Sequence, residues 1–304
     1  MKTSVVIPTY GREGVLVDTI RTLLALADPA DEILVIDQTP SHEPKVEAQL
    51  LAWSEQGRIK HVVDQPPGVV AAMNRGLHEA DGLLVLFLDD DIVPGVELVK
   101  AHRETHLTQP DVWAVVGQVL QPGQEPLDVE QPLVGGGLCA DLNFKFNATQ
   151  GRDIRNVMAG NLSVKRVDAL AIGGFDECFP PPVAYRFETD FARRILQAGG
   201  RILFEPKASI RHLAAASGGT RSLGSHLTSA SPLHGVGDYI FALRHGSGLE
   251  RWCYIMRRPF REVRTKYHLT HPWWIPVKFV GEIRALRLAF RLSHDKSASE
   301  KATS

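Results

Sequence analysis

The chain has 304 residues, of which 44% are hydrophobic, so its length allows one large domain or two small ones with a substantial core. Its formal net charge of −1 gives no general attraction for nucleic acid, and its three scattered cysteines argue against a disulfide framework or a zinc knuckle. The N-terminal apolar run is too short for a signal peptide, and no apolar stretch reaches the ~18 residues that predict a transmembrane helix.

Short hydrophobic runs alternate with helical patterns in the first ninety residues. The runs at 3–8, 31–37, 58–65 and 83–88 predict strands. Apolar residues at helical spacing predict helices within 13–27, 42–56 and 66–82. Because the strands are almost continuously hydrophobic and alternate with helices, we expect a mostly parallel, Rossmann-like α/β sheet with helices on both faces.

The pattern is less regular after this point. A strand is predicted from residue 112, a surface loop at 121–132, and a turn, a strand and a short helix within 156–179. A helix and a strand ending at His212 follow, and the Ala-, Ser- and Gly-rich segment 213–237 is expected to be a flexible loop.

Polar clusters stand at the carboxyl ends of three predicted strands. They are Pro8–Tyr10, Asp37 and Asp89–Asp91. In parallel α/β sheets, ligands bind beyond the carboxyl ends of the strands, so these clusters predict a binding site at one edge of the sheet.

Three consecutive aspartates, Asp89, Asp90 and Asp91, directly follow the predicted strand at 83–88. Adjacent carboxylates repel unless something neutralises them. A divalent cation would do so, because Mg²⁺ and Mn²⁺ prefer oxygen ligands and often bind between carboxylates and a substrate diphosphate. The alternative is an acidic turn or a helix N-cap, where aspartate is also favoured.

Two later motifs could add chemistry to such a site. Glu188 and Asp190 lie at the start of a predicted helix, and a carboxylate there could act as a general base. The alternative is that these acids only complement the helix dipole. His212 ends a predicted strand and could bind a metal or a phosphate, although a single histidine is often structural.

These segments occur together in the order and spacing typical of one family. From Lys2 to His212 the chain resembles family 2 glycosyltransferases with the GT-A fold. The resemblance rests on SVVIPTYGRE, ILVIDQTP, PPGVVAAMNRGLHEADG, LLVLFLDDD, MAGNLSVKR, GGFDECF, ETDFARRILQAGGRILFEP and IRHL. It implies a GT-A domain at 1–212, with a nucleotide-binding half at 1–118 and an acceptor-side half at 119–212.

The resemblance also implies roles for individual residues. The positions that it assigns to the nucleotide-sugar donor are Pro8, Thr9, Tyr10, Arg12, Asp37, Gly68, Asn74, Arg75, Asp89, Asp90, Gly160 and Asn161. Asp89 to Asp91 resemble the DXD motif, so Asp91, Asp89 and His212 are the expected ligands of Mn²⁺ or Mg²⁺. Glu188 takes the position of the general base, with Asp190 beside it as a second catalytic candidate. Phe187 replaces an acid of the common family pattern.

The resemblance implies a metal-assisted, inverting transfer of a sugar from a UDP- or dTDP-sugar to a hydroxyl of a glycan or lipid-linked acceptor. A hexosyl and a rhamnosyl donor fit equally. Two alternatives remain open at this stage. One is a relative that binds nucleotides or glycans without catalysis, and the other is a nucleotidyltransferase of similar sheet topology.

The C-terminal segment has a different charge balance. Ten Lys or Arg residues and two acids lie between Arg251 and His294, among several aromatic residues. We expect a basic, amphipathic helical extension at 238–294 and a disordered tail at 295–304. The extension could lie on an anionic membrane surface, bind a lipid-linked acceptor, or pack as a cap or dimer interface. The sparse cysteines fit a reducing compartment, so we expect a cytoplasmic protein that can also lie on the inner face of the cell membrane.

Overall fold

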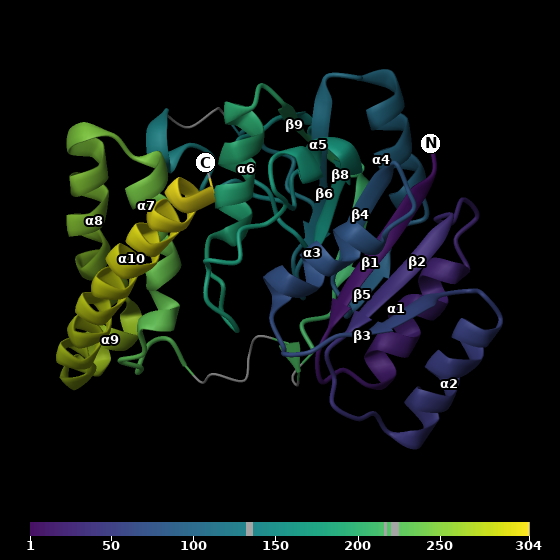
Figure 1. Ribbon diagram of the computed structural model, residues 1–304, viewed down its shortest axis with the longest axis horizontal. Coiled ribbons are helices and arrows are strands. Elements are labelled where there is room, and N and C mark those ends of the chain that lie inside the picture. The colour runs from purple at the N-terminus through teal and green to yellow at the C-terminus, as the bar shows by residue number, and fades with distance from the viewer. Residues whose placement is uncertain (132–135, 216–217, 220–224, 304) are drawn as a thin grey trace.

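The computed structural model describes residues 1–131, 136–215, 218–219 and 225–303, with the backbone alone described after residue 294. Within these residues the strands form one nine-stranded sheet, and a group of C-terminal helices lies beside it (Figure 1). The predicted α/β class with a C-terminal helical extension is therefore confirmed.

The first half of the chain forms the parallel part of the sheet. Its strands are β1 (Thr3–Thr9), β2 (Glu32–Asp37), β3 (Lys60–Val63) and β4 (Leu84–Leu88), in the order β3-β2-β1-β4. The helices between them are α1 (Gly14–Leu24), α2 (Pro44–Glu55) and α3 (Val69–Glu79). All seven elements lie where the hydrophobic patterns predict them. β1, β2 and β4 are buried, β3 is a more exposed edge strand, and each helix has one apolar face.

The second half of the sheet is mixed, which corrects the expectation of a mostly parallel sheet. Its strands are β5 (Ile92–Pro94), β6 (Val112–Leu120), β7 (Arg152–Asp153), β8 (Asn161–Lys165) and β9 (Arg201–His212). β8 runs antiparallel to both β4 and β6, while β9 is parallel to β6. β8 lies between β4 and β6 and begins at the end of the sheet where β6 finishes. The described part of the segment between β6 and β8 contains no α-helix, and a helix is the usual connection between parallel strands.

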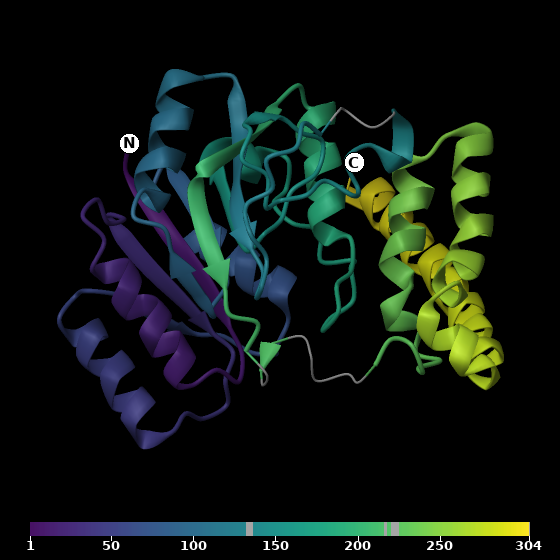
Figure 2. The same cartoon turned by 180° about the vertical axis from the view of Figure 1, so that it is seen from behind.

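Two cores cover the two faces of the sheet. Successive residues of β1 point to opposite faces, so Val5 and Ile7 join the core under α1, α2 and α4 (Leu98–Thr108), whereas Val6 joins the other. α3, α5 (Arg166–Ala171) and α6 (Phe187–Gln197) cover that second face, as the two opposite views show (Figures 1 and 2). Gly76 brings α3 against β1, because a Cβ there would lie 2.3 Å from Val6 Cγ1.

The C-terminal helices pack beside α6. They are α7 (Val236–His245), α8 (Gly248–Val263), α9 (Lys266–Thr270) and α10 (Ile275–Thr303). α10 continues to Thr303, so the backbone is helical through most of the segment where we expect a disordered tail. Half of that segment is Ala, Lys or Glu, which favour helices, and it contains no Gly or Pro. Of the loop expected at 213–237, residues 216–217 and 220–224 lie outside the described residues, and its last two residues already belong to α7.

Candidate active site

The site forms where β4 and β9 end. Leu88 is the last residue of β4, and Asp89–Asp91 link it to β5. β5 pairs antiparallel with the end of β9, and this register places Ile92 opposite His212. The three aspartates therefore neither open a helix nor form a free turn. They are held between two strands, with the imidazole of His212 beside them.

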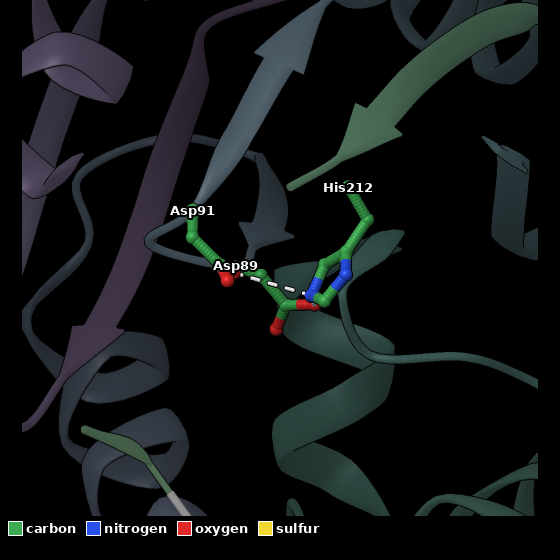
Figure 3. A group of neighbouring side chains, drawn as sticks. All are labelled: Asp89, Asp91 and His212. Atoms are coloured by element: carbon green, nitrogen blue, oxygen red, sulfur yellow. Dashed lines mark ion pairs between the residues drawn. The ribbon is translucent and has the colours of Figure 1, made fainter. Parts of the chain in front are cut away.

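Asp89, Asp91 and His212 form a candidate metal centre. His212 Nε2 lies 3.1 Å from Asp91 Oδ1 and 3.5 Å from Asp89 Oδ2. One ligand atom from each residue lies within 4.8 Å of the others, and the side chains converge from the β4–β5 connection and from the end of β9 (Figure 3). Burial alone would raise the pKa of Asp91, but hydrogen bonds from His212 and the Ala215 N–H outweigh it and hold that pKa below its ordinary value.

Asp90 points to the other side of the turn. Its Oδ2 accepts a hydrogen bond from Thr9 Oγ1 at 2.8 Å, and its Oδ1 lies 3.1 Å from Arg12 Nε. Arg12 also reaches Asp91 Oδ2 at 3.3 Å, so one guanidinium bridges two aspartates. Burial and the neighbouring aspartates raise the pKa of Asp90 to about 6, despite Arg12 and Thr9. Asp90 therefore ties β1 to the strand-end turn and leaves Asp89 and Asp91 to face a ligand.

A cleft of about 230 Å³ opens beside these residues. It is lined by nine residues that the sequence analysis predicts for the donor or the metal: Pro8, Thr9, Tyr10, Arg12, Gly68, Asp89, Asp90, Asp91 and His212. Six more lining residues carry no prediction: Gln38, Pro67, Val69, Pro182, Gly218 and Gly219. The structure thus brings most of the predicted donor and metal residues together at one edge of the sheet.

Asp37 does not line this cleft, although the resemblance assigns it to the nucleotide-sugar donor. Its side chain is only 2% exposed, and its Oδ2 lies 2.7 Å from His42 Nε2 and 2.8 Å from His61 Nε2. Its Oδ1 accepts a hydrogen bond from the Thr39 N–H. Although burial opposes ionisation, these hydrogen bonds lower the pKa of Asp37 to about 2. In this arrangement Asp37 orders the turn after β2 rather than facing the cleft.

Glu188 lies close to the metal candidate. It stands in the first turn of α6, and its Oε1 accepts a hydrogen bond from the Ala159 N–H. The next residue, Gly160, lies against Asp89, because a Cβ there would be 2.2 Å from Asp89 Oδ2. Burial raises the pKa of Glu188 to about 7, and the nearby charge of Asp89 adds to the rise.

Asp190 does not share this site. Its side chain is fully buried, and its carboxylate lies 2.8 Å from Arg194 Nε, 3.2 Å from Arg244 Nη1 and 2.9 Å from His245 Nε2. Burial would raise its pKa, but these partners hold that pKa below the ordinary value. Asp190 therefore joins α6 to α7, and its expected catalytic role finds no support in this position.

Asn161 is also structural in this arrangement. It is fully buried, its Nδ2 donates to the carbonyl oxygens of Gln118 and Ala208, and its Oδ1 lies 2.9 Å from His102 Nε2. Its amide joins β8 to β6 and β9 below the edge that faces the cleft.

Asn74 and Arg75 line a second, larger cavity of about 990 Å³ between α3 and the segment 172–184. Asn74 exchanges hydrogen bonds with the backbone of Phe175, and Arg75 pairs with Glu79 on the same helix. This cavity shares Pro67, Gly68 and Val69 with the cleft.

Two cleft residues that the sequence analysis did not predict, Gln38 and Gly219, form hydrogen bonds with predicted donor-binding residues. Gln38 Oε1 accepts a hydrogen bond from the Gly68 N–H at 2.8 Å, and the Gly219 N–H donates to the Tyr10 carbonyl at 2.8 Å. Gln38 directly follows Asp37, so its place after β2 could have marked it. Gly219 lies in a segment whose composition gives no such signal.

Comparison with known proteins decides the family. A sequence model described as glycosyl transferase family 2 matches residues 4–162, which is more than half of the chain. The chain belongs to this family. It is therefore a glycosyltransferase that takes its sugar from a nucleotide sugar, and the predicted family is confirmed. The nucleotidyltransferase alternative gains no support.

Curated relatives of this family 2 glycosyltransferase act on different substrates. The glucosyl-dolichyl phosphate glucuronosyltransferase of Haloferax volcanii is 25% identical over 231 residues, which cover 70% of this chain and 69% of that protein. The GalNAc(5)-diNAcBac-PP-undecaprenol beta-1,3-glucosyltransferase of Campylobacter jejuni is 35% identical over 92 residues, which cover 30% of this chain and 29% of that protein.

Solved structures show the same fold. The structure of residues 1–349 of S. aureus TarS in complex with UDP-GlcNAc has a TM-score of 0.60 at 14% identity and covers 98% of this chain and 92% of that one. The mannosyltransferase PcManGT from Pyrobaculum calidifontis, in complex with GDP-Man and Mn²⁺, has a TM-score of 0.55 at 18% identity and covers 98% of this chain and 80% of that one. These likenesses confirm the predicted GT-A fold.

Proposed function

We propose that the enzyme is a metal-assisted, inverting hexosyltransferase that acts on a hydroxyl of a glycan or lipid-linked acceptor. The observation that carries this proposal is the position of Glu188, which accepts a hydrogen bond from the Ala159 N–H, while the following residue, Gly160, lies against Asp89 of the candidate metal centre. A single displacement at the anomeric carbon requires a base close to the metal centre that would hold the donor diphosphate.

The three candidate ligands fit a hard divalent cation. Asp89, Asp91 and His212 would hold Mn²⁺ or Mg²⁺ with one atom each and leave other positions to water and the donor diphosphate. A bound cation would offset the charge that develops on the departing diphosphate. In support, PcManGT, which shares the fold, was solved with a nucleotide sugar and Mn²⁺.

The reaction itself needs one proton transfer and one displacement. Glu188, as carboxylate, removes the proton from the acceptor hydroxyl. The hydroxyl oxygen forms a bond to the anomeric carbon while the bond from that carbon to the diphosphate breaks. The nucleoside diphosphate leaves with the bonding electron pair, and the anomeric configuration inverts because attack and departure occur on opposite faces.

A hexosyl donor is favoured over a rhamnosyl donor, because the relatives named above transfer glucuronosyl or glucosyl groups. UDP- and dTDP-sugars remain the proposed donors. The solved relatives carry UDP-GlcNAc and GDP-Man, so a GDP-sugar belongs in the test as well.

The proposal is tested by incubating the purified chain with UDP-glucose, UDP-glucuronate, UDP-GlcNAc, dTDP-glucose, dTDP-rhamnose and GDP-mannose, and measuring nucleoside diphosphate release. We expect slow release from one hexosyl donor with water as acceptor, and its loss after chelation by EDTA with recovery on added Mn²⁺. Release that is unaffected by EDTA would contradict the role of the metal.

A further inference from the structure

The outer face of α8 carries an apolar stripe. Leu249, Trp252, Met256 and Phe260 recur every three or four residues along this helix, so they lie on one side of it. Their side chains are 78%, 49%, 64% and 56% exposed, whereas the opposite side of α8 is buried. Isolated exposed apolar residues need no explanation, but a continuous stripe along about three turns marks an interaction surface.

α10 extends this surface. Phe260 of α8 contacts Phe279 of α10, with ring centroids 5.8 Å apart. Val280, Ile283 and Phe290 lie on the adjoining exposed side of α10. Trp273, in the turn just before α10, is 63% exposed. Of the nineteen large apolar side chains that are exposed within the described residues, nine lie between Leu249 and Phe290, so the clustering is specific to the C-terminal helices.

The exposed charges around this surface are basic except for Glu250 in the first turn of α8, whose Oε1 accepts a hydrogen bond from the Leu138 N–H. Between residues 251 and 294, all of which the structure describes, the exposed charged residues are Arg257, Arg261, Arg264, Lys266, Arg284, Arg287 and Arg291. The two acids of this segment, Glu262 and Glu282, are half-buried and buried, and both pair with Arg258. The fold therefore turns these two acids inward and leaves basic side chains beside the apolar stripe, of which Arg261 also pairs with buried Asp238.

We propose that this surface, made by the exposed apolar and basic side chains of α8 and α10, docks the enzyme on an anionic lipid membrane. Exposed tryptophan, phenylalanine and leucine side chains can enter the region between headgroups and acyl chains, while arginines contact anionic headgroups. Among the described residues no helix is long and apolar enough to cross a bilayer, so this contact is peripheral.

Charge complementarity distinguishes the membrane from a second copy of the chain. In a two-fold symmetric dimer the same patch meets itself, so the arginines of one copy would face those of the other. Like charges brought together in this way oppose association. An anionic bilayer supplies the opposite charge and an apolar interior at once.

Sedimentation of the full chain with lipid vesicles tests the proposal. We expect binding to vesicles of phosphatidylcholine mixed with phosphatidylglycerol, weak binding to phosphatidylcholine alone, and release by added salt. Replacing Arg257 and Arg264 by glutamine should lower the partition coefficient about fivefold for each residue, the effect expected of a basic residue near an anionic surface. The double substitution Trp252→Glu and Met256→Glu should abolish binding.

Leu51→Glu provides the matched control. Leu51 is 56% exposed on α2, at the other end of the molecule from α8, so this variant should bind vesicles like the wild type (Figure 1). Thermal stabilisation by the nucleotide should be unchanged in all variants, which separates this proposal from the one on catalysis. The proposal would be overturned if the Trp252→Glu, Met256→Glu double variant bound vesicles as well as the wild type. It would also be overturned if the wild type eluted as a dimer in gel filtration and the double variant eluted as a monomer.

Discussion

At the scale of single residues, Glu188 differs from the acids around it. Asp91 and Asp190 are held ionised by cationic or hydrogen-bonding partners. Glu188 has one backbone donor and a neighbouring aspartate, so burial raises its pKa to about 7. A carboxyl group whose pKa lies near neutrality can both take a proton and release it, which is the property a general base needs.

Glu188→Gln keeps the hydrogen bond from the Ala159 N–H but cannot accept a proton at its amide. We therefore expect sugar transfer to fall about 10²- to 10⁴-fold, with little change in nucleotide binding. Initial rates and thermal shift with the nucleotide measure the two effects. Glu104→Gln, at an exposed position on α4, serves as the control. A Glu188→Gln enzyme with full transfer activity would show that another group is the base.

The pH dependence of transfer follows from the same residue. The base must be ionised, so the rate should rise with pH and level off above the pKa of Glu188, which is about 7 without metal. A cation at Asp89 favours the carboxylate form, so the midpoint in the presence of Mn²⁺ should lie at or below that value. A rate that falls as pH rises through this range is incompatible with Glu188 as the base.

The sequence predicted the residues of the cleft better than their roles. Asp89, Asp91 and His212 were predictable because each stands at the end of a strand, where ligands bind in this class of sheet. Asp37 ends β2, Asn161 begins β8 and Asp190 lies in the first turn of α6, but buried partners on other segments take up their polar atoms. Nothing in the local sequence reveals those partners.

At the scale of elements, Asp238 links the sheet domain to the C-terminal helices. Its buried carboxylate on α7 lies 2.7 Å from Arg186 Nε and 2.9 Å from Arg258 Nε, and it also accepts hydrogen bonds from Tyr254 and Arg261. Burial would raise its pKa, but the three arginines lower it to about 2. Arg186 directly precedes α6, the helix that carries Glu188, so α7 and α8 help to fix where that helix begins.

Asp238→Asn should destabilise the fold, because it leaves buried arginines without their counter-charge. A loss of about 3–5 kcal/mol is expected from the removal of one member of a buried ion pair. Urea denaturation measures it, with Asp111→Asn as the control, since Asp111 pairs with Arg201 on the exposed surface. If both variants unfold at the same urea concentration, the network contributes nothing to stability.

The native ion pairs of Asp238 should weaken only when pH falls towards 2.

The direction of β8 and the pairing of β5 with β9 were not predictable from the pattern. Hydrophobic periodicity gives the position of a strand but not its direction or its neighbour. The contact of His212 with Asp91 depends on that pairing. From the sequence, only the resemblance to the family assigned His212 and Asp91 to the same site.

At the scale of the whole molecule, the two proposed functional surfaces are separate. The cleft at the edge of the sheet is the proposed site of the nucleotide sugar, and the apolar and basic surface of α8 and α10 is the proposed membrane contact. The Asp238 network lies between them and joins the helices to α6. This arrangement fits an enzyme whose acceptor is presented at a lipid surface.

Thermal stability with nucleotide and metal tests the central claim most directly. Wild type and Asp91→Asn are each heated with UDP, dTDP, GDP or CMP, with and without Mn²⁺. A nucleotide at about a hundred times its dissociation constant should stabilise the wild type by about 2.7 kcal/mol. We predict that one nucleoside diphosphate stabilises the wild type only when Mn²⁺ is present, and that Asp91→Asn loses this effect. Stabilisation that is the same with and without Mn²⁺, or that Asp91→Asn retains, would contradict a metal-assisted nucleotide-sugar site at this strand end.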